Sequence, residues 1–389
     1  MIIFEIRKFP ILFFIERLIE NQIRKKIGTG KAIVVMGARQ TGKTTLLKRI
    51  FSEDCLWLDG DELEVRNLFA NISAARFKAL IGKRHTIVID EAQRIDDIGL
   101  KLKLITDNLP EVQLVATGSS SFELANKINE PLTGRKWQYQ MFPLSFAEMV
   151  NHHGLLQEKM LLNHRLLFGY YPDIVNNQGE EKELLQQLSD SVLYKDILKF
   201  DAIQKTDRLI KLLQALAYQV GSQVSYSELA QLCGIDGKTV EKYILILEQA
   251  YIIFRLKPFS RNLRSELKNT RKFYFYDNGL RNALIADFRQ VEMRMDVGAL
   301  WENFIISERI KYLNYNGLWV NNWFWRTVEQ KEIDYLEEAD GQISACEFKW
   351  SADAKVKLPK QFTETYPNST FKVIHRENFE NFLLPEASS

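Results

Sequence analysis

One stretch near the N-terminus constrains the fold of this chain more than any other. It fits the pattern G-x-x-x-x-G-K-[ST] and consists of Gly37-Ala38-Arg39-Gln40-Thr41-Gly42-Lys43-Thr44. The apolar run before it, 32–36, is typical of a buried strand, and the residues from Thr45 to Ile50 are typical of a helix. Glycines let the backbone turn so that successive N–H groups point at one anion, and a helix N-terminus adds positive charge. The pattern therefore predicts a phosphate-binding loop.

Within this loop, two side chains are expected to contact a nucleoside triphosphate and its metal. Lys43 can reach the β- and γ-phosphates, and the Thr44 hydroxyl can bind Mg²⁺. The other residues of the loop, 37–42, and Thr45 would also bind the phosphates. The alternative is a glycine-rich turn that matches the pattern by chance.

A second apolar run, 86–89, ends in the acids Asp90 and Glu91. In P-loop NTPases the first acid of such a pair supports Mg²⁺, and the next orients or deprotonates the attacking water. We therefore assign Asp90 to the metal and Glu91 to catalysis. Two acids can also simply cap the end of a strand, but both motifs in this order favour binding of ATP with Mg²⁺.

Polar residues also follow a third apolar run, 112–116. Because the carboxyl ends of parallel strands form the ligand-binding edge of an α/β sheet, Thr117, Ser119 and Ser120 are expected at the level of the γ-phosphate. Ser119 or Ser120 would then sense that phosphate. The alternative is a serine-rich turn with helix caps.

Two arginines deserve separate predictions. Arg135 follows Gly134 in a predicted loop, and a fixed guanidinium suits the arginine-finger role, which a neighbouring subunit often supplies. Arg17 belongs to a predicted helix over 11–27. It could approach the nucleotide, but we expect it to be a solvated charge.

Length and composition restrict the class of protein. A chain of 389 residues predicts two to three domains, and 46% hydrophobic with 26% charged residues is typical of soluble globular proteins. A net charge of +2 implies that any nucleic-acid surface is local. The three cysteines lack metal-type spacing, and charges interrupt the N-terminal apolar run. We expect a reduced, cytoplasmic protein without a membrane span.

A second unit is predicted to begin near residue 206. Its order of helix, helix, tight turn, helix and strand is the winged helix-turn-helix pattern. Basic residues outnumber acids after the last helix, namely Arg255, Lys257, Arg261, Arg264, Lys268, Arg271 and Lys272 against Glu266. Such a basic wing would contact the phosphates of double-stranded DNA. The alternative is a packing module whose charges are solvated.

The last unit carries a second chemical possibility. Glu347 and Lys349 are two apart on a predicted strand, so their side chains leave the same face. Asp334 on a neighbouring strand and Glu302 on a helix could join them. Carboxylates such as Asp334 and Glu347 holding Mg²⁺, with a lysine near the attacking water, suit hydrolysis of a phosphodiester. The alternative is an exposed strand face with alternating charges.

Taken together, these stretches resemble a widespread prokaryotic family of AAA-type ATPases with a C-terminal part of unassigned function. The resemblance covers nearly the whole chain and rests on 37–44, 89–93, 117–120, 132–135, 142–146, 169–172 and 276–280. It implies an α/β fold class: a P-loop parallel sheet with helices on both faces, then a winged helix and a restriction-endonuclease-like domain. It also implies active-site positions at Glu302, Asp334, Glu347 and Lys349, and a finger at Arg135.

The expected domains are a P-loop domain with a helical extension over 1–205, a winged helix over 206–290 and a nuclease-like domain over 291–389. The expected function is Mg²⁺-dependent ATP hydrolysis driving a switch or an assembly on DNA, with a C-terminal nuclease activity in the sharper form. The rival is a nucleotide-dependent regulator that works through protein partners and has an inactive nuclease fold. An arginine finger acting in trans would require a homo-oligomer.

Overall fold

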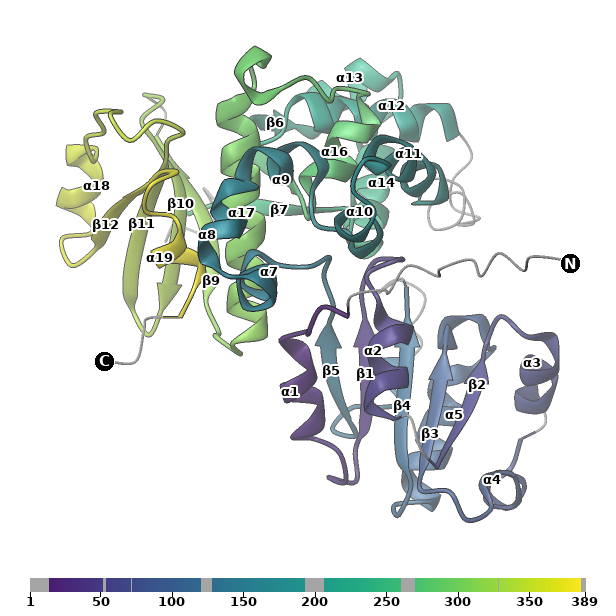
Figure 1. The fold of residues 1–389 in the computed structure, drawn as a ribbon. Coiled ribbons are helices and arrows are strands. Elements are labelled where there is room, and N and C mark those ends of the chain that lie inside the picture. Colours follow the sequence, from purple (N-terminus) through teal and green to yellow (C-terminus); the bar gives the residue numbers. More distant parts are fainter. Residues whose placement is uncertain are drawn as a thin grey trace, which may run out of the picture.

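The computed structural model describes residues 14–51, 54–70, 72–119, 128–192, 206–259, 270–327 and 329–385. Its N-terminal part is an α/β layer structure, separate in Figure 1 from a helical unit and from a second sheet near the C-terminus. The α/β part comprises β1 (Ala32–Met36), β2 (Cys55–Asp59), β3 (Thr86–Asp90), β4 (Gln113–Gly118) and β5 (Lys136–Gln140), with helices α1 (Ile19–Arg24), α2 (Lys43–Ile50), α3 (Leu63–Ala70), α4 (Ala74–Ile81), the short helix η1 (Ala92–Arg94) and α5 (Ile98–Asn108).

These five strands form one parallel sheet in the order β2-β3-β4-β1-β5. Strand β1 is buried along its whole length because helices cover both faces of the sheet. Its even-numbered residues pack with α3, α4 and α5. Its odd-numbered residues Ile33 and Val35 pack with α1 and α2. The prediction of a parallel sheet with helices on both faces is confirmed.

A helical unit follows, and its members are α7 (Phe146–His153), α8 (Leu155–Met160), α9 (Leu162–Phe168), α10 (Pro172–Asn176), α11 (Glu181–Ser191), α12 (Thr206–Tyr218), α13 (Tyr226–Cys233), α14 (Gly237–Gln249), α16 (Asn278–Leu284) and η3 (Val291–Met293). Local sequence sets several of these starts. Ser145 and Glu148 form a capping box at α7, and Pro172 occupies the first turn of α10. The helices from 146 to 192, predicted as an extension of the P-loop domain, share one core with the helices after 206.

The C-terminal part contains α17 (Val297–Tyr315), β9 (Asn321–Arg326), β10 (Glu332–Ala339), β11 (Gln342–Phe348), α18 (Lys360–Thr365), β12 (Thr370–Ile374) and α19 (Glu380–Leu383). Its strands continue those of the middle unit, β6 (Gln223–Ser225), β7 (Ile253–Pro258) and β8 (Thr270–Phe275), in one sheet ordered β12-β11-β10-β9-β7-β8-β6. The junction is the parallel pairing of Lys257 with Trp323 and of Pro258 with Phe324. The predicted boundary near 290 thus falls between parts that share a sheet.

Helix α17 is the longest helix described, with 19 residues. It runs down the middle of Figure 1, between the C-terminal strands and the helical unit, and its lower end points toward α1. Side chains are buried on several faces of this helix because it packs against more than one part of the molecule. No helix among the described residues is both long and apolar enough to cross a membrane.

Candidate nucleotide site and C-terminal acidic cluster

The phosphate-binding loop sits at the carboxyl end of β1 and enters α2. A Cβ on Gly37 would lie 2.0 Å from the Met141 carbonyl oxygen, so only glycine fits there. Gly42 has φ +91 and directly precedes α2, a left-handed conformation that glycine adopts without strain. Gln40 is also left-handed, with φ 58. These turns place the loop around the N-terminus of α2, where N–H groups have no helical partner.

The predicted phosphate and metal residues meet at this loop. The Lys43 ammonium donates to the carbonyl oxygens of Gly37 at 2.9 Å and Ala38 at 2.7 Å, so its side chain lies across its own loop. The Thr44 hydroxyl donates to Asp90 Oδ2 at 2.7 Å. A hydroxyl and a carboxylate side by side are the hard oxygen ligands that Mg²⁺ prefers, so this pair fits the predicted metal.

Behind the carboxylate of Asp90, polar groups from β4 and η1 fix the two acids. Asp90 Oδ1 accepts hydrogen bonds from the Thr117 hydroxyl and, at 3.2 Å, from the Glu91 N–H. Glu91 has a left-handed backbone with φ 47, and its Oε2 accepts from Gln93 Nε2 at 2.5 Å and from the Ser119 hydroxyl at 3.3 Å. Gln93 also donates to Ser119 Oγ at 3.1 Å. Glu91 is therefore held in one orientation beside Thr44 and Asp90.

Some predicted loop residues differ in their surroundings. Ala38 and Thr41 are buried, Arg39 is half-buried, and Gln40 and Thr45 are exposed. Ser120 lies outside the described residues. The sequence analysis gave Gln93 no role. The signal that could have found it is its position two residues after Glu91, because a tight turn there brings the two side chains together.

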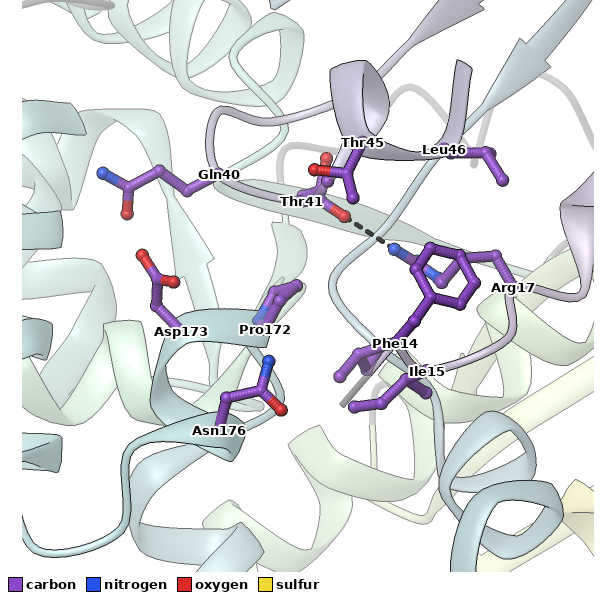
Figure 2. A pocket seen from close by; sticks show the side chains of 12 residues that line it. Phe14, Ile15, Arg17, Gln40, Thr41, Thr45, Leu46, Pro172, Asp173 and Asn176 are labelled. Atoms are coloured by element: carbon purple, nitrogen blue, oxygen red, sulfur yellow. Dashed lines mark hydrogen bonds between the residues drawn. The ribbon is translucent and has the colours of Figure 1, made fainter. Parts of the chain in front are cut away.

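A cavity of about 250 Å³ opens beside the loop. Figure 2 shows Gln40, Thr41 and Thr45 on one side of it and Pro172, Asp173 and Asn176 of α10 on the other. Its remaining lining is mostly apolar and comes from Phe14, Ile15, Gly42, Leu46 and Leu144, together with Arg17. The stretch 169–172, named above as part of the resemblance, thus leads into α10, which lines the cavity next to the phosphate loop.

The expectation of a solvated Arg17 is wrong. Arg17 is 6% exposed, and it precedes α1, which begins at Ile19 in the part of the chain that the structure describes. The guanidinium donates to the Thr41 carbonyl at 2.6 Å, to the Phe142 carbonyl at 2.7 Å and to Glu148 Oε1 at 3.0 Å. Arg17 therefore fixes the back of the phosphate loop, as the dashed line in Figure 2 shows.

Arg135 lies at the opposite edge of the sheet. Its carbonyl accepts from the N–H of Ala32, at the start of β1, whereas the phosphate loop follows the end of that strand. Its guanidinium pairs with Asp107 at 2.6 Å. Arg135 therefore does not join the phosphate loop of its own chain, and its role as a finger in trans stays a prediction.

In the C-terminal part, three of the predicted side chains come together. Lys349 Nζ lies 2.7 Å from Glu347 Oε2 and 3.4 Å from Asp334 Oδ2. Asp334 also accepts from the Phe348 N–H at 2.9 Å. Burial first, and then the charge of Asp334, raises the pKa of Glu347 to about 7. The alternative of a fully exposed face is wrong, because Asp334 and Glu347 are 9% and 8% exposed.

Glu302 joins these residues through a second lysine that the sequence did not indicate for this place. Lys272 Nζ lies 3.2 Å from Glu302 and 2.5 Å from Glu332, and the Tyr274 hydroxyl donates to Glu302 at 2.6 Å. Burial opposes the charge on Lys272, but Glu302, Asp334 and Glu332 outweigh it and raise the pKa of the ammonium. We call the side chains of Lys272, Glu302, Glu332, Asp334, Glu347 and Lys349 together the acidic cluster. Within the described ranges, no three or more His, Cys, Asp or Glu side chains are arranged to hold a metal ion.

Two described residues of the predicted basic wing, Arg255 and Lys272, make internal contacts. Arg255 pairs with Glu248 and also donates to the Tyr226 hydroxyl. Lys272 is 2% exposed inside the acidic cluster, so neither residue faces DNA phosphates. The cause is tertiary packing, which spacing along the sequence does not reveal. Lys257 is exposed, while Arg261, Arg264, Lys268 and the acid Glu266 lie outside the described residues.

Comparison with known protein families assigns the N-terminal part. Residues 29–150 match the family model described as an AAA domain. The match supports a P-loop AAA-type ATPase. Residues 159–291 and 297–383 match two further models, each described as a domain of unknown function (DUF8612 and DUF4143). This AAA-type segment contains the phosphate loop, Asp90, Glu91, Ser119 and Arg135.

Relatives of this chain match most of its length. An uncharacterized protein of Mycobacterium tuberculosis is 24% identical over 334 residues, which are 84% of this chain and 72% of that protein. An uncharacterized protein of Methanocaldococcus jannaschii is 24% identical over 345 residues, 82% of this chain and 75% of that protein. One of Haemophilus influenzae is 26% identical over 284 residues, 65% of this chain and 68% of that protein.

Solved structures show more distant likenesses. The Walker-type ATPase of Pyrococcus abyssi has a TM-score of 0.48 and 15% identity, covering 70% of this chain and 96% of that one. A signal transduction ATPase with a tetratricopeptide repeat sensor from Pyrococcus horikoshii has a TM-score of 0.30 and 13% identity, covering 78% of this chain and 48% of that one. Both scores lie below 0.5, a likeness too distant to imply a shared mechanism.

Proposed function

We propose that this chain binds ATP with Mg²⁺ at the phosphate loop, hydrolyses it, and uses the nucleotide state as a switch on its C-terminal part. The observation that carries the proposal is the meeting of three groups at the mouth of the loop. Thr44 and Asp90 lie 2.7 Å apart, and Glu91 adjoins Asp90 in the sequence, with its carboxylate held by Gln93 and Ser119. This is the set of groups that phosphoryl transfer to water requires.

Each group has a distinct part in this reaction. Loop N–H groups at the start of α2 bind the phosphate oxygens. Lys43 turns from the carbonyls of Gly37 and Ala38 toward the β- and γ-phosphates. Thr44 and Asp90 hold Mg²⁺, which neutralises charge on the phosphate oxygens when bound. Glu91 Oε2 orients the attacking water and accepts its proton. Ser119 keeps Glu91 in place and senses the γ-phosphate.

The cavity beside the loop is proposed to hold the nucleoside. Once the phosphates occupy the loop, the rest of the nucleotide must lie next to it, and the described cavity there has an apolar wall from Phe14, Ile15 and Pro172. The Asp173 carboxylate and the Asn176 amide are the polar groups that line its far side. They supply acceptors and donors for ribose hydroxyls or base edges.

Binding of MgATP tests this proposal before hydrolysis is measured. Isothermal titration calorimetry is expected to show MgATP binding by the wild type and a loss of at least about tenfold in affinity for Lys43→Ala, because the charge facing the phosphates is removed. Lys78→Ala, on the exposed surface of α4, is the matched control and should bind like the wild type. A wild type that does not bind MgATP would overturn the proposal.

DNA is proposed as the target of the switch, through a winged helix over the middle of the chain. The support is the order of α12, β6, α13, α14, β7 and β8, with antiparallel pairing of β8 to β6 and β7. α14 exposes Lys238 and Lys242. Stimulation of ATP turnover by double-stranded DNA, lost in a Lys238→Ala/Lys242→Ala variant, is the expected result. A rate indifferent to DNA would favour the rival, a regulator that acts through protein partners.

A nuclease is the second candidate activity, supported by the contacts of Lys349 with Asp334 and Glu347 on neighbouring strands. In that case the two carboxylates would hold Mg²⁺ and Lys349 would lie near the attacking water. The test is DNA cleavage in Mg²⁺ or Mn²⁺, with Asp334→Ala and Lys349→Ala expected to abolish cutting without affecting ATP turnover. Absence of cutting under all these conditions would leave a nuclease-like fold without that activity.

A further inference from the structure

One face of α17 holds the segment that follows β5. Glu308, Lys311 and Tyr315 are spaced at i, i+3 and i+7, so they share a helix face. Glu308 Oε2 accepts from the Phe146 N–H at 2.7 Å, Lys311 Nζ donates to the Leu144 carbonyl at 2.9 Å, and the Tyr315 hydroxyl accepts from the Phe142 N–H at 3.1 Å. Three side chains of the helix thus bind every second residue of this segment.

Arg17 joins that segment to the phosphate loop. Its Nη2 donates to the Phe142 carbonyl at 2.7 Å and to the Tyr315 hydroxyl at 3.3 Å, and its Nη1 donates to the Thr41 carbonyl at 2.6 Å. Leu144 from the same segment lines the cavity beside the loop. Arg17 therefore links Tyr315, at the C-terminal end of α17, directly to Thr41 in the phosphate loop.

The other half of α17 holds the acidic cluster and its strand. Glu302 contacts Lys272 at 3.2 Å and Tyr274 at 2.6 Å, both on β8. Asn303 accepts from the Phe275 N–H at 2.7 Å and donates to the Phe275 carbonyl at 3.1 Å. With 19 residues, the helix is about 28 Å long, which separates the contacts at its two ends.

We propose that α17 couples the nucleotide site to the acidic cluster, and that Arg17 and Tyr315 are the positioning pair through which this coupling passes. The proposal rests on the proposed function, because it makes MgATP the ligand that changes the loop. Lys43 must leave the Gly37 and Ala38 carbonyls to reach phosphate, and the peptide of Thr41, held from behind by Arg17, lies in the same turn. A shift there is transmitted to Tyr315 and along a helix that is hydrogen-bonded at both ends.

Hydrogen–deuterium exchange tests the direction from nucleotide to cluster. MgATP is expected to change the exchange of backbone amides over 297–303 and 332–336 in the wild type. Tyr315→Phe keeps the ring but removes the hydroxyl that contacts Arg17 and Phe142, so the change at the cluster should be lost in this variant while the loop itself still responds. Tyr312→Phe is the matched control, because Tyr312 lies on the same helix and stacks with Arg309 instead.

A double-mutant cycle tests the reciprocal direction, since coupling between two sites is symmetric in binding free energy. Glu302→Gln should change the dissociation constant of MgATP by about threefold or more in the wild-type background. In the Tyr315→Phe background the same substitution should change it by less than about 1.5-fold. The dissociation constants come from calorimetry, and circular dichroism checks that each variant is folded.

Two failures can be told apart. If the wild type binds no MgATP, the proposed function fails. If MgATP binds but leaves the amides of the acidic cluster unchanged, or if the effects of Glu302→Gln and Tyr315→Phe are simply additive, the coupling is overturned and the ATPase proposal stands. An equal loss of coupling in Tyr312→Phe would overturn the assignment to the Tyr315 hydroxyl.

Discussion

At the scale of single residues, Glu91 is placed by its neighbours rather than by its own strand. The chain turns into a left-handed conformation at Glu91, with φ 47, and the side chain is then fixed by Gln93 and Ser119. A carboxylate that must orient water depends on such fixation, because a small misplacement reduces the rate steeply. Gln93 is thus a positioning residue for the proposed reaction.

Substitution of Gln93 should separate turnover from binding. In Gln93→Ala, kcat for ATP is expected to fall about tenfold, while KM changes by less than about threefold, because Glu91 loses one of its two partners but the phosphate loop is intact. Steady-state phosphate release measures both constants. Gln138→Ala, on exposed surface of β5, is the control and should match the wild type. A rise in KM at constant kcat would contradict the positioning role.

The sequence predicted the groups at this site better than the contacts between them. Thr44, Asp90 and Glu91 were identified because short motifs specify the loop and the strand ends locally. Arg17 was not, because its partner Tyr315 is 298 positions away in the sequence. A buried guanidinium needs several acceptors, and only the folded chain shows that Thr41, Phe142 and Glu148 supply them.

At the scale of elements, two loops far apart in sequence hold α10 against the cavity. Asp277 caps α16 through the Leu280 N–H at 2.9 Å and also accepts from the Tyr170 N–H at 2.6 Å. The backbones approach so closely that a Cβ on Gly279 would lie 2.1 Å from the Phe168 carbonyl oxygen. The stretches 169–172 and 276–280, both part of the family resemblance, therefore pack against each other.

Two glycines in the first turns of helices should respond in opposite ways to alanine. Gly279→Ala is expected to lower the midpoint of thermal unfolding by about 5 to 10 °C, because backbone atoms must shift. Gly298→Ala, in α17, meets nothing within 4 Å and should leave the midpoint unchanged or raise it slightly. Circular dichroism melts measure both. Equal midpoints for the two variants would contradict the close approach.

An ion pair after α16 should make stability depend on acid pH. Hydrogen bonds from Arg289, at 2.9 and 2.8 Å, lower the pKa of Asp287 from 3.8 to about 2, with a further contribution from Arg294. Because the folded-state pKa is depressed, this stabilisation is present above about pH 4 and is lost as the pH falls toward 2.

The midpoint of thermal unfolding, measured between pH 6 and pH 2.5, checks this sign. Asp287→Asn should lower the midpoint at pH 6, and the difference from the wild type should shrink below pH 4. Asp353→Asn, at an exposed position, serves as the control. A difference that grows toward low pH would show that the sign is wrong.

Elements were predicted where their signals are local. The predicted apolar runs became β1, β3 and β4, and Ser145, Ser225 and Asp236 cap helices through contacts within three residues along the chain. The joining of β7 to β9 was not predicted, because strand pairing across more than 60 positions leaves no periodic signal. That pairing is also why Lys272, expected on a basic wing, points into the acidic cluster.

At the scale of the whole molecule, the position of Arg135 makes oligomerisation testable. Arg135 lies at the edge of the sheet opposite to its own phosphate loop, so a finger role requires a second copy. Arg135→Ala should then lower kcat without weakening MgATP binding, and the specific activity of the wild type should rise with protein concentration. Sedimentation combined with ATPase assays measures this. An active ATPase that stays monomeric would contradict the assignment.

Hydrolysis of ATP at the P-loop site, with Glu91 as the base, is the proposed activity on which the switch and the coupling depend. The most direct measurement is single-turnover hydrolysis of MgATP by the wild type and by Glu91→Gln, which has nearly the same shape but cannot accept the proton. We predict equal MgATP affinity and a rate at least about 100-fold lower in the variant. Equal rates of hydrolysis in the two proteins would contradict this role of Glu91.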